Sequence, residues 1–77
     1  NQFIITDDHK NIYFQSYNSM IVKKDTLYNQ IFLDQKYWNH SNTTGKYRNI
    51  FLNETIKDTR KKIKSGEYKL TDLNGGL

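Results

Sequence analysis

The sequence predicts a small α+β domain, in which an antiparallel sheet of three to five strands carries one or two helices on one face. Three observations lead to this prediction. Short apolar runs alternate with polar turns in the first half, a helical pattern with signals at both ends follows, and an alternating run comes last. A sheet and an amphipathic helix bury their apolar faces most simply against each other. We expect a single domain over residues 1–77, with a flexible tail at 74–77.

Four short runs in the first half and one near the end are typical of strands. Residues 3–5 and 12–14 are apolar and separated by a polar cluster, which predicts a hairpin. Residues 20–22 resume a strand, and the dense apolar run 27–33 favours a central strand, with a helix as the open alternative. Residues 68–71 alternate between apolar and polar, as expected of a strand that returns to the sheet.

The stretch from Trp38 to Tyr68 holds the strongest helical signal. It begins at Ser41 or Asn42, whose side chains can cap free N–H groups, and it ends at Gly66, which tolerates a left-handed cap. Trp38, just before the helical pattern, is expected to close the core at the sheet edge together with Tyr37. One apolar stripe has the helical period and consists of Leu52, Ile56, Thr59 and Ile63.

A second apolar cluster, formed by Tyr47, Ile50 and Phe51, is rotated by about 140° from that stripe. One straight helix would therefore need two apolar faces. Thr55 followed by Asp58 resembles a capping box, so we expect a break near residues 53–55 and two helices, 42–53 and 56–65. A single bent helix is the alternative.

The composition limits the size of the hydrophobic core and indicates the cellular compartment. Hydrophobic residues make up only 35% of the 77 residues, but six Tyr, four Phe and one Trp each remove a large area from water. We expect a thin, aromatic-rich core, either in a marginal monomer or in a chain whose exposed aromatics a partner covers, with a homodimer left open. The absence of Cys favours a reducing compartment, so we expect the cytoplasm, and no apolar run has membrane-span length.

Positive charge is concentrated in the second half. Lys and Asp cancel over residues 1–40, so residues 41–77 carry the whole net charge of +4. Four basic residues fall on one arc of the second predicted helix and are the candidate partner-binding residues: Lys57, Arg60, Lys61 and Lys64. Two interpretations stay open, an ordinary solvated face, or a contact for phosphates or an acidic protein surface.

Aromatic and basic residues also alternate in the first predicted helix, where Lys46, Tyr47 and Arg48 are secondary candidates. Aromatic rings beside cations suit single-stranded nucleic acid. The alternative is that Tyr47 packs in the core while Lys46 is solvated. A helix-turn-helix reading of residues 42–65 is weak, because the proposed turn lacks glycine.

The sequence offers no catalytic or metal-binding constellation. His9 and His40 are far apart and there is no Cys, so three or four zinc ligands are not available at a suitable spacing. Asp7 and Asp8 lie in a polar turn, where a solvated pair is expected rather than an acid and a base. Gly45 is isolated, which excludes a phosphate-cradling loop. We therefore expect no enzyme activity, no metal and no cofactor.

Six short blocks of the sequence carry a resemblance: Ser16–Ser19, Trp38–Ser41, Thr43-Thr44, Lys46-Tyr47, Phe51-Leu52 and Ile63–Tyr68. Together they resemble a family of very small uncharacterised proteins carried by phages and mobile elements of low-GC Gram-positive bacteria. The resemblance covers about residues 12–74 and leaves out residues 1–11. It implies a setting in which small non-enzymatic proteins disable host machinery by binding, anti-CRISPR proteins among them. No residue role follows from it.

The leading functional expectation is a phage or mobile-element protein that inhibits a host defence or nucleic-acid-processing complex by protein contact, in the manner of an anti-CRISPR protein. Its expected partner is a host protein or ribonucleoprotein complex in the host bacterial cytoplasm. The alternative is a small basic regulator that binds nucleic acid directly, which the charge of residues 41–77 favours.

Overall fold

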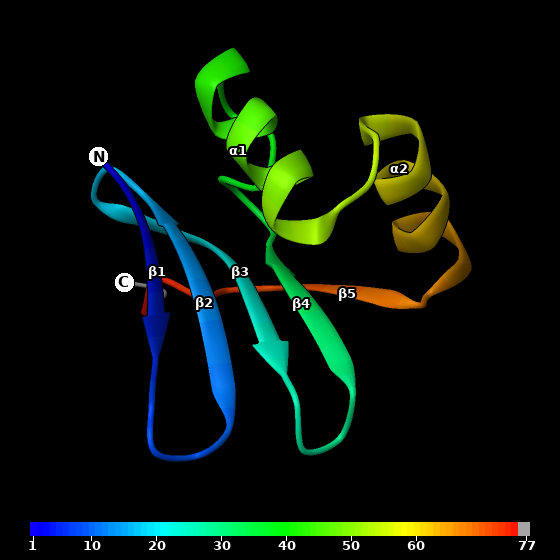
Figure 1. Cartoon of the computed structure of the whole chain (residues 1–77). Helices are drawn as coiled ribbons and strands as arrows, with labels where there is room; N and C mark the ends of the chain where they lie inside the picture. Colours follow the sequence, from blue (N-terminus) through cyan, green and yellow to red (C-terminus); the bar gives the residue numbers. More distant parts are fainter. Residues whose placement is uncertain (76–77) are drawn as a thin grey trace.

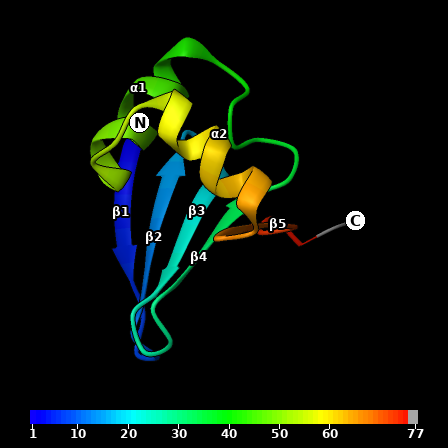
Figure 2. The ribbon, with the colours of Figure 1, turned by 90° about the vertical axis from the view of Figure 1, so that its right-hand side faces the viewer.

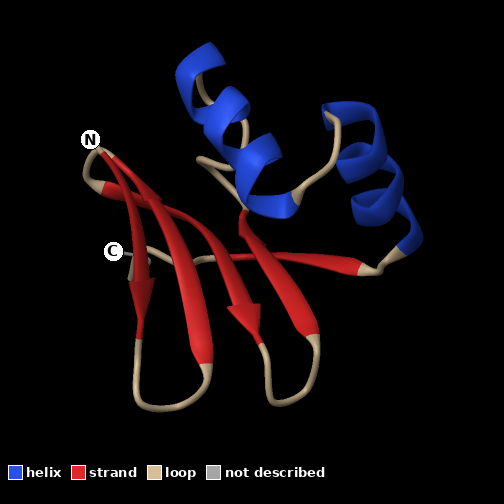
Figure 3. Ribbon diagram, in the orientation of Figure 1, coloured by secondary structure: helices blue, strands red, loops and turns tan. Residues whose placement is uncertain are grey.

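A computed structural model describes residues 1–75 and has two layers, a five-stranded sheet and a pair of helices on one side of it (Figures 1, 2 and 3). Two hairpins come first, then both helices, then a last strand. The elements are β1 (Gln2–Thr6), β2 (Asn11–Ser16), β3 (Ser19–Asp25), β4 (Gln30–Asp34), α1 (Asn42–Leu52), α2 (Ile56–Ser65) and β5 (Tyr68–Thr71).

The sheet is mixed, with strand order β1-β2-β3-β4-β5. The first four strands form antiparallel neighbours, whereas β5 lies parallel to β4, with Ile31 opposite Tyr68. The predicted α+β class is confirmed, but the prediction of an all-antiparallel sheet was wrong for the last strand. The two helices return the chain to the end of the sheet where β4 began, so β5 must run in the same direction as β4.

The predicted break between two helices is confirmed. Ser41 caps α1 by accepting a hydrogen bond from the Thr44 N–H, and Asn53 ends that helix in the left-handed region at φ 55°. Thr55 then caps α2 through the Asp58 N–H, and Gly66 closes it at φ 86°. Because α1 ends at a C-cap, Asn53, and α2 begins after an N-cap, Thr55, a single bent helix is excluded.

The turn between β3 and β4 is longer than the sequence predicts, so one predicted strand begins too early. Residues 27–29, expected to begin a central strand, lie in the turn, and β4 begins only at Gln30. The Asp25 carboxylate accepts hydrogen bonds from the N–H groups of Leu27 and Tyr28, and Asn29 is left-handed at φ 53°. Asp and Asn favour such turns through their own side chains, and here they outweigh the apolar pattern. Leu27 and Tyr28 are consequently exposed.

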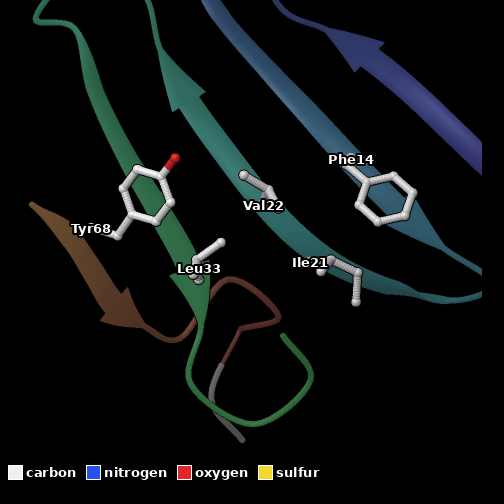
Figure 4. Packing of buried hydrophobic residues seen from close by; sticks show 5 residues of the cluster. All are labelled: Phe14, Ile21, Val22, Leu33 and Tyr68. Carbon is white, nitrogen blue, oxygen red and sulfur yellow. The ribbon is translucent and has the colours of Figure 1, made fainter. Parts of the chain in front are cut away.

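The core lies between the helices and the facing side of the sheet, and Figure 4 shows its five buried apolar side chains on the strands. Within residues 1–75, its fully buried apolar residues come from strands, and partly buried residues of α1, α2 and the loop before α1 cover them. Phe51 of α1 stacks on Phe14 at a centroid distance of 5.8 Å, and Trp38 and Tyr37 pack at the periphery. The strand residues of the core are Phe14, Ile21, Val22, Leu33 and Tyr68.

The chain after β5 is tied to the sheet. Leu73 donates its N–H to the buried carboxylate of Asp34. Asn74 accepts from the Met20 N–H and donates to the Met20 carbonyl, at 2.7 and 3.0 Å. Asn74, the first residue of the tail expected at 74–77, thus contacts β3, while residues 76 and 77 lie outside the described part of the chain.

Candidate interaction surface around helix α2

Helix α2 carries the four basic side chains singled out by the sequence, and all four are exposed: Lys57, Arg60, Lys61 and Lys64. They are called the α2 basic face below. Among residues 1–75 the ion pair present joins Lys62 to Glu54, so none of the four charges is paired with a carboxylate. The face therefore presents unpaired positive charge to solvent.

Lys62, the neighbour of these four residues, points inward to a buried carboxylate. Glu54 lies between the helices with its side chain only 6% exposed, and its Oε1 accepts from the Lys62 ammonium and the Tyr68 hydroxyl, both at 2.7 Å. Its Oε2 accepts from the fully buried Thr59 hydroxyl. Thr59, predicted as part of an apolar stripe, thus supplies a hydrogen bond that anchors α2 to the interhelical linker.

The ionisation of this network follows from its geometry. Burial raises the pKa of Glu54, but the hydrogen bonds from Lys62, Thr59 and Tyr68 outweigh burial and hold the pKa below its ordinary value. The hydrogen bond to Glu54 raises the pKa of Lys62. Burial, together with the bond to Glu54, raises the pKa of Tyr68 to about 12. Glu54 is therefore charged, and Tyr68 neutral, across the physiological range.

Trp38 connects the two helices through two guanidinium groups. Arg48 of α1 lies 5.2 Å from the centre of the Trp38 ring, and Arg60 of α2 lies 5.7 Å from it. The planar guanidinium of an arginine is attracted to the face of an aromatic ring. Because one ring meets both cations, Trp38 restrains the position of Arg60 within the α2 basic face.

The three secondary candidates separate in the structure. Lys46 and Tyr47 are exposed, and the Lys46 ammonium lies 5.7 Å from the centre of the Tyr47 ring. Arg48 is fully buried, so it is not on the surface with them. Its terminal nitrogens donate to three neutral oxygens at 2.8–3.0 Å: the Trp38 carbonyl and the side chains of Asn39 and Asn49. Burial lowers the pKa of the Arg48 guanidinium.

Sequence reasoning missed a second surface, an apolar cleft between α1 and the edge strand β1. The cleft has a volume of about 210 Å³. Ile4 and Ile50, on its two sides, are 68% and 65% exposed. A signal was present in the sequence, because residues 1–6 contain no charged residue in a chain that is 26% charged. The lining residues are Gln2, Phe3, Ile4, Phe14, Tyr47, Ile50 and Phe51.

The sheet face opposite the helices carries a mixed aromatic and basic row. Strand register places one residue from each strand in this row, and it alternates with the buried residues of the other face. The Lys23 ammonium lies 5.7 Å from the centre of the Phe32 ring. The row contains Ile5, Tyr13, Lys23, Phe32 and Lys69.

No group of three or more metal-ligating side chains comes together within residues 1–75. In the same residues, neither helix has the length and apolarity to cross a membrane.

Fold and surface together define a small mixed-sheet α+β protein with a basic helix at one edge of its sheet. A family of unknown function, DUF8033, matches residues 1–68, which is most of the chain. The chain belongs to this family, and the match includes β1. No curated protein and no solved structure matches the chain. The family description assigns no activity, so a function has to be argued from the surfaces of the chain itself.

Proposed function

We propose that this protein is a non-enzymatic binding protein whose α2 basic face docks on an acidic surface of a host defence or nucleic-acid-processing complex. In this proposal it acts in the bacterial cytoplasm and inhibits its target by occupying that surface, as an anti-CRISPR protein does. No cofactor takes part. The resemblance to small phage and mobile-element proteins directs the proposal toward host defence.

The observation that carries the proposal is the contrast between Lys62 and its neighbours. Lys62 is neutralised by Glu54, whereas the four residues of the α2 basic face are exposed and pair with no carboxylate in the part of the chain that the structure describes. Arg60 is also restrained by Trp38, which lowers the entropy that it would lose on binding. A face of this kind accelerates encounter with an acidic partner and favours one orientation of docking.

Direct binding of single-stranded nucleic acid is a second candidate, and the row on the open sheet face favours it. Tyr13 and Phe32 could stack on bases while Lys23 and Lys69 neutralise phosphates. This surface is separate from the α2 basic face, so substitutions distinguish the two functions.

Salt dependence of nucleic-acid binding provides the first test. One variant changes all four residues of the α2 basic face to Gln, and a matched control changes the exposed residues Lys10, Lys24, Lys36 and Lys46 to Gln, so both lose the same charge. If the α2 basic face neutralised about four phosphates, the logarithm of duplex affinity would fall with slope about −3.6 against the logarithm of salt concentration. Under the inhibitor proposal, DNA and RNA bind weakly, and the two variants behave alike.

Inhibition in cells provides the second test. The chain is expressed in bacteria that carry a defined CRISPR or restriction system, and phage plating efficiency is measured. We expect wild type and the control variant to restore plating and the α2 variant to lose this effect. Tight binding of naked nucleic acid at physiological salt, abolished in the α2 variant, would reject the inhibitor proposal in favour of a nucleic-acid-binding regulator that uses the α2 basic face. Tight binding that persists in the α2 variant would favour the row on the open sheet face instead.

A further inference from the structure

Within residues 1–75, strand β1 lies at one edge of the sheet, and the direction of its hydrogen-bonding groups can be assigned. At its two ends, Asp7 donates to the Asn11 carbonyl and the Asn1 carbonyl accepts from Tyr17, so the odd-numbered residues of β1 face β2. Inward and outward groups alternate along an antiparallel strand. The N–H and C=O groups of Gln2, Ile4 and Thr6 therefore point away from the sheet.

This edge lacks the features that normally prevent pairing with another chain. Proteins protect edge strands with charged residues, proline or bulges. Residues 1–6 contain neither charge nor proline, and the pairing of β1 with β2 is regular from Gln2 to Thr6. Phe3, Ile4 and Ile5 are 47%, 68% and 39% exposed. By contrast, the other edge strand, β5, carries Lys69.

We propose that β1 pairs antiparallel with β1 of a second copy of this chain, about a two-fold axis at Ile4. The sequence of the strand reads polar, apolar, apolar, apolar, polar, so this pairing is self-complementary. Gln2 then lies opposite Thr6 of the second copy, and Ile4 lies opposite Ile4. These are the residues with outward-pointing groups, and each pair exchanges two hydrogen bonds, about six in all.

The same arrangement covers the apolar surface beside the strand. Ile4 pairs with Phe14, a core residue, so its side chain is on the helix-bearing face and lines the cleft. Side chains of opposed residues point to the same face of the sheet. The Ile4 side chain of the second copy therefore lies beside the cleft and close to Ile50. The α2 basic faces of the two copies do not repel each other at this interface, since α2 packs on β5 at the opposite edge of the sheet (Figure 1).

Analytical ultracentrifugation over a micromolar to submillimolar concentration series provides the test. We expect wild type to dimerise and Ile4→Lys, which places two ammonium groups opposite each other, to weaken dimerisation about tenfold or more. Leu27→Lys is the matched control, because Leu27 is 65% exposed and lies in the turn between β3 and β4. It adds the same charge and should dimerise like wild type.

Cysteine cross-linking tests the register independently. The chain has no Cys, so Ile4→Cys introduces a single thiol. Opposed residues in a hydrogen-bonded antiparallel pair have Cα atoms about 5.5 Å apart, which a disulfide spans. We expect mild oxidation to link Ile4→Cys chains in pairs and to leave Leu27→Cys chains largely unlinked.

Three results would overturn the proposal. Wild type could remain monomeric over the whole series, in which case this edge accepts a strand of another protein or none. Dimers could persist unchanged in Ile4→Lys, or Leu27→Cys could cross-link as readily as Ile4→Cys. Because none of these measurements includes a target complex, they are independent of the inhibitor proposal.

Discussion

Arg48 donates a hydrogen bond to the carbonyl oxygen of Trp38 at 2.8 Å and lies 5.2 Å from the centre of the Trp38 ring. Its guanidinium is fully buried, yet the oxygens of residues 1–75 that accept its hydrogen bonds are all neutral. A buried cation is costly unless its donors are satisfied, and a planar group with several fixed donors satisfies oxygens that point from different directions. The terminal nitrogens of Arg48 are satisfied in this way, whereas its buried Nε has no hydrogen-bond partner within residues 1–75. Arg48 therefore acts as a structural centre for the loop before α1.

Replacing Arg48 by Lys should lower the free energy of unfolding by about 2–3 kcal/mol, because a compact ammonium cannot reach all three oxygens and leaves acceptors unpaired. Arg60→Lys is the control, since Arg60 contacts the same ring but is exposed and should change stability by about 0.5 kcal/mol at most. Urea denaturation followed by circular dichroism measures both. Equal effects of the two substitutions would contradict a structural role specific to Arg48.

Trp38→Ala should cost about 3 kcal/mol, near the lower end for loss of a large aromatic because Trp38 is only partly buried. The change removes packing against the core and both guanidinium contacts. Thermal unfolding measures the loss, and Trp38→Phe should recover part of it. A Trp38→Ala variant with near-native thermal stability but no inhibitory activity would show that Trp38 is an interface residue instead.

Glu54→Ala should destabilise the fold by about 2–3 kcal/mol, because the Tyr68 hydroxyl loses its acceptor and Lys62 loses its counter-ion. The Thr59 hydroxyl also loses Glu54 and keeps only the Thr55 carbonyl as an acceptor. The value is below that of a fully buried pair, since the Lys62 side chain is 35% exposed. Chemical denaturation measures the effect. Glu67→Ala, in the exposed turn after α2, is the control and should be close to neutral.

Alkaline pH should destabilise the protein through Tyr68. Its pKa is about 12 in the folded protein and 10.0 ordinarily, so the unfolded chain loses the phenolic proton first. The stability that this group contributes is complete below pH 10 and is lost as the pH rises through about 12. Lys62, whose pKa is also raised, acts in the same direction.

The measurement is the melting temperature of wild type and Tyr68→Phe from neutral pH to pH 12. We expect the variant to be less stable at neutral pH, because it lacks the hydrogen bond to Glu54, but to lose less stability on alkalinisation. Parallel curves for the two proteins would show that Tyr68 does not carry the alkaline transition.

Local signals in the sequence were sufficient to predict the helical half. Ser41, Thr55 and Gly66 mark helix ends through their own side chains or backbone freedom, and such signals do not depend on distant contacts. The exposure of the α2 basic face also follows from helical spacing alone.

Features set by tertiary structure were not predictable in the same way. The direction of β5 depends on the end of the sheet to which the two helices return the chain. The burial of Arg48 depends on oxygens contributed by the loop before α1. Leu27 and Tyr28 were assigned to a strand because their apolar character outweighed the turn signal of Asp25. Predicting the row on the open sheet face would have required the register of all five strands.

The parallel pairing of β4 with β5 also affects the order of folding. Strands β1 to β4 meet through short turns, whereas Ile31 and Tyr68 are separated by both helices. Contacts between distant parts of a chain cost more loop-closure entropy and form later. As the chain leaves the ribosome, we therefore expect the four-stranded meander to assemble first. The outer edge of β4 then remains unpaired until residues 68–71 emerge, and this interval is when the nascent protein is most exposed to misassembly.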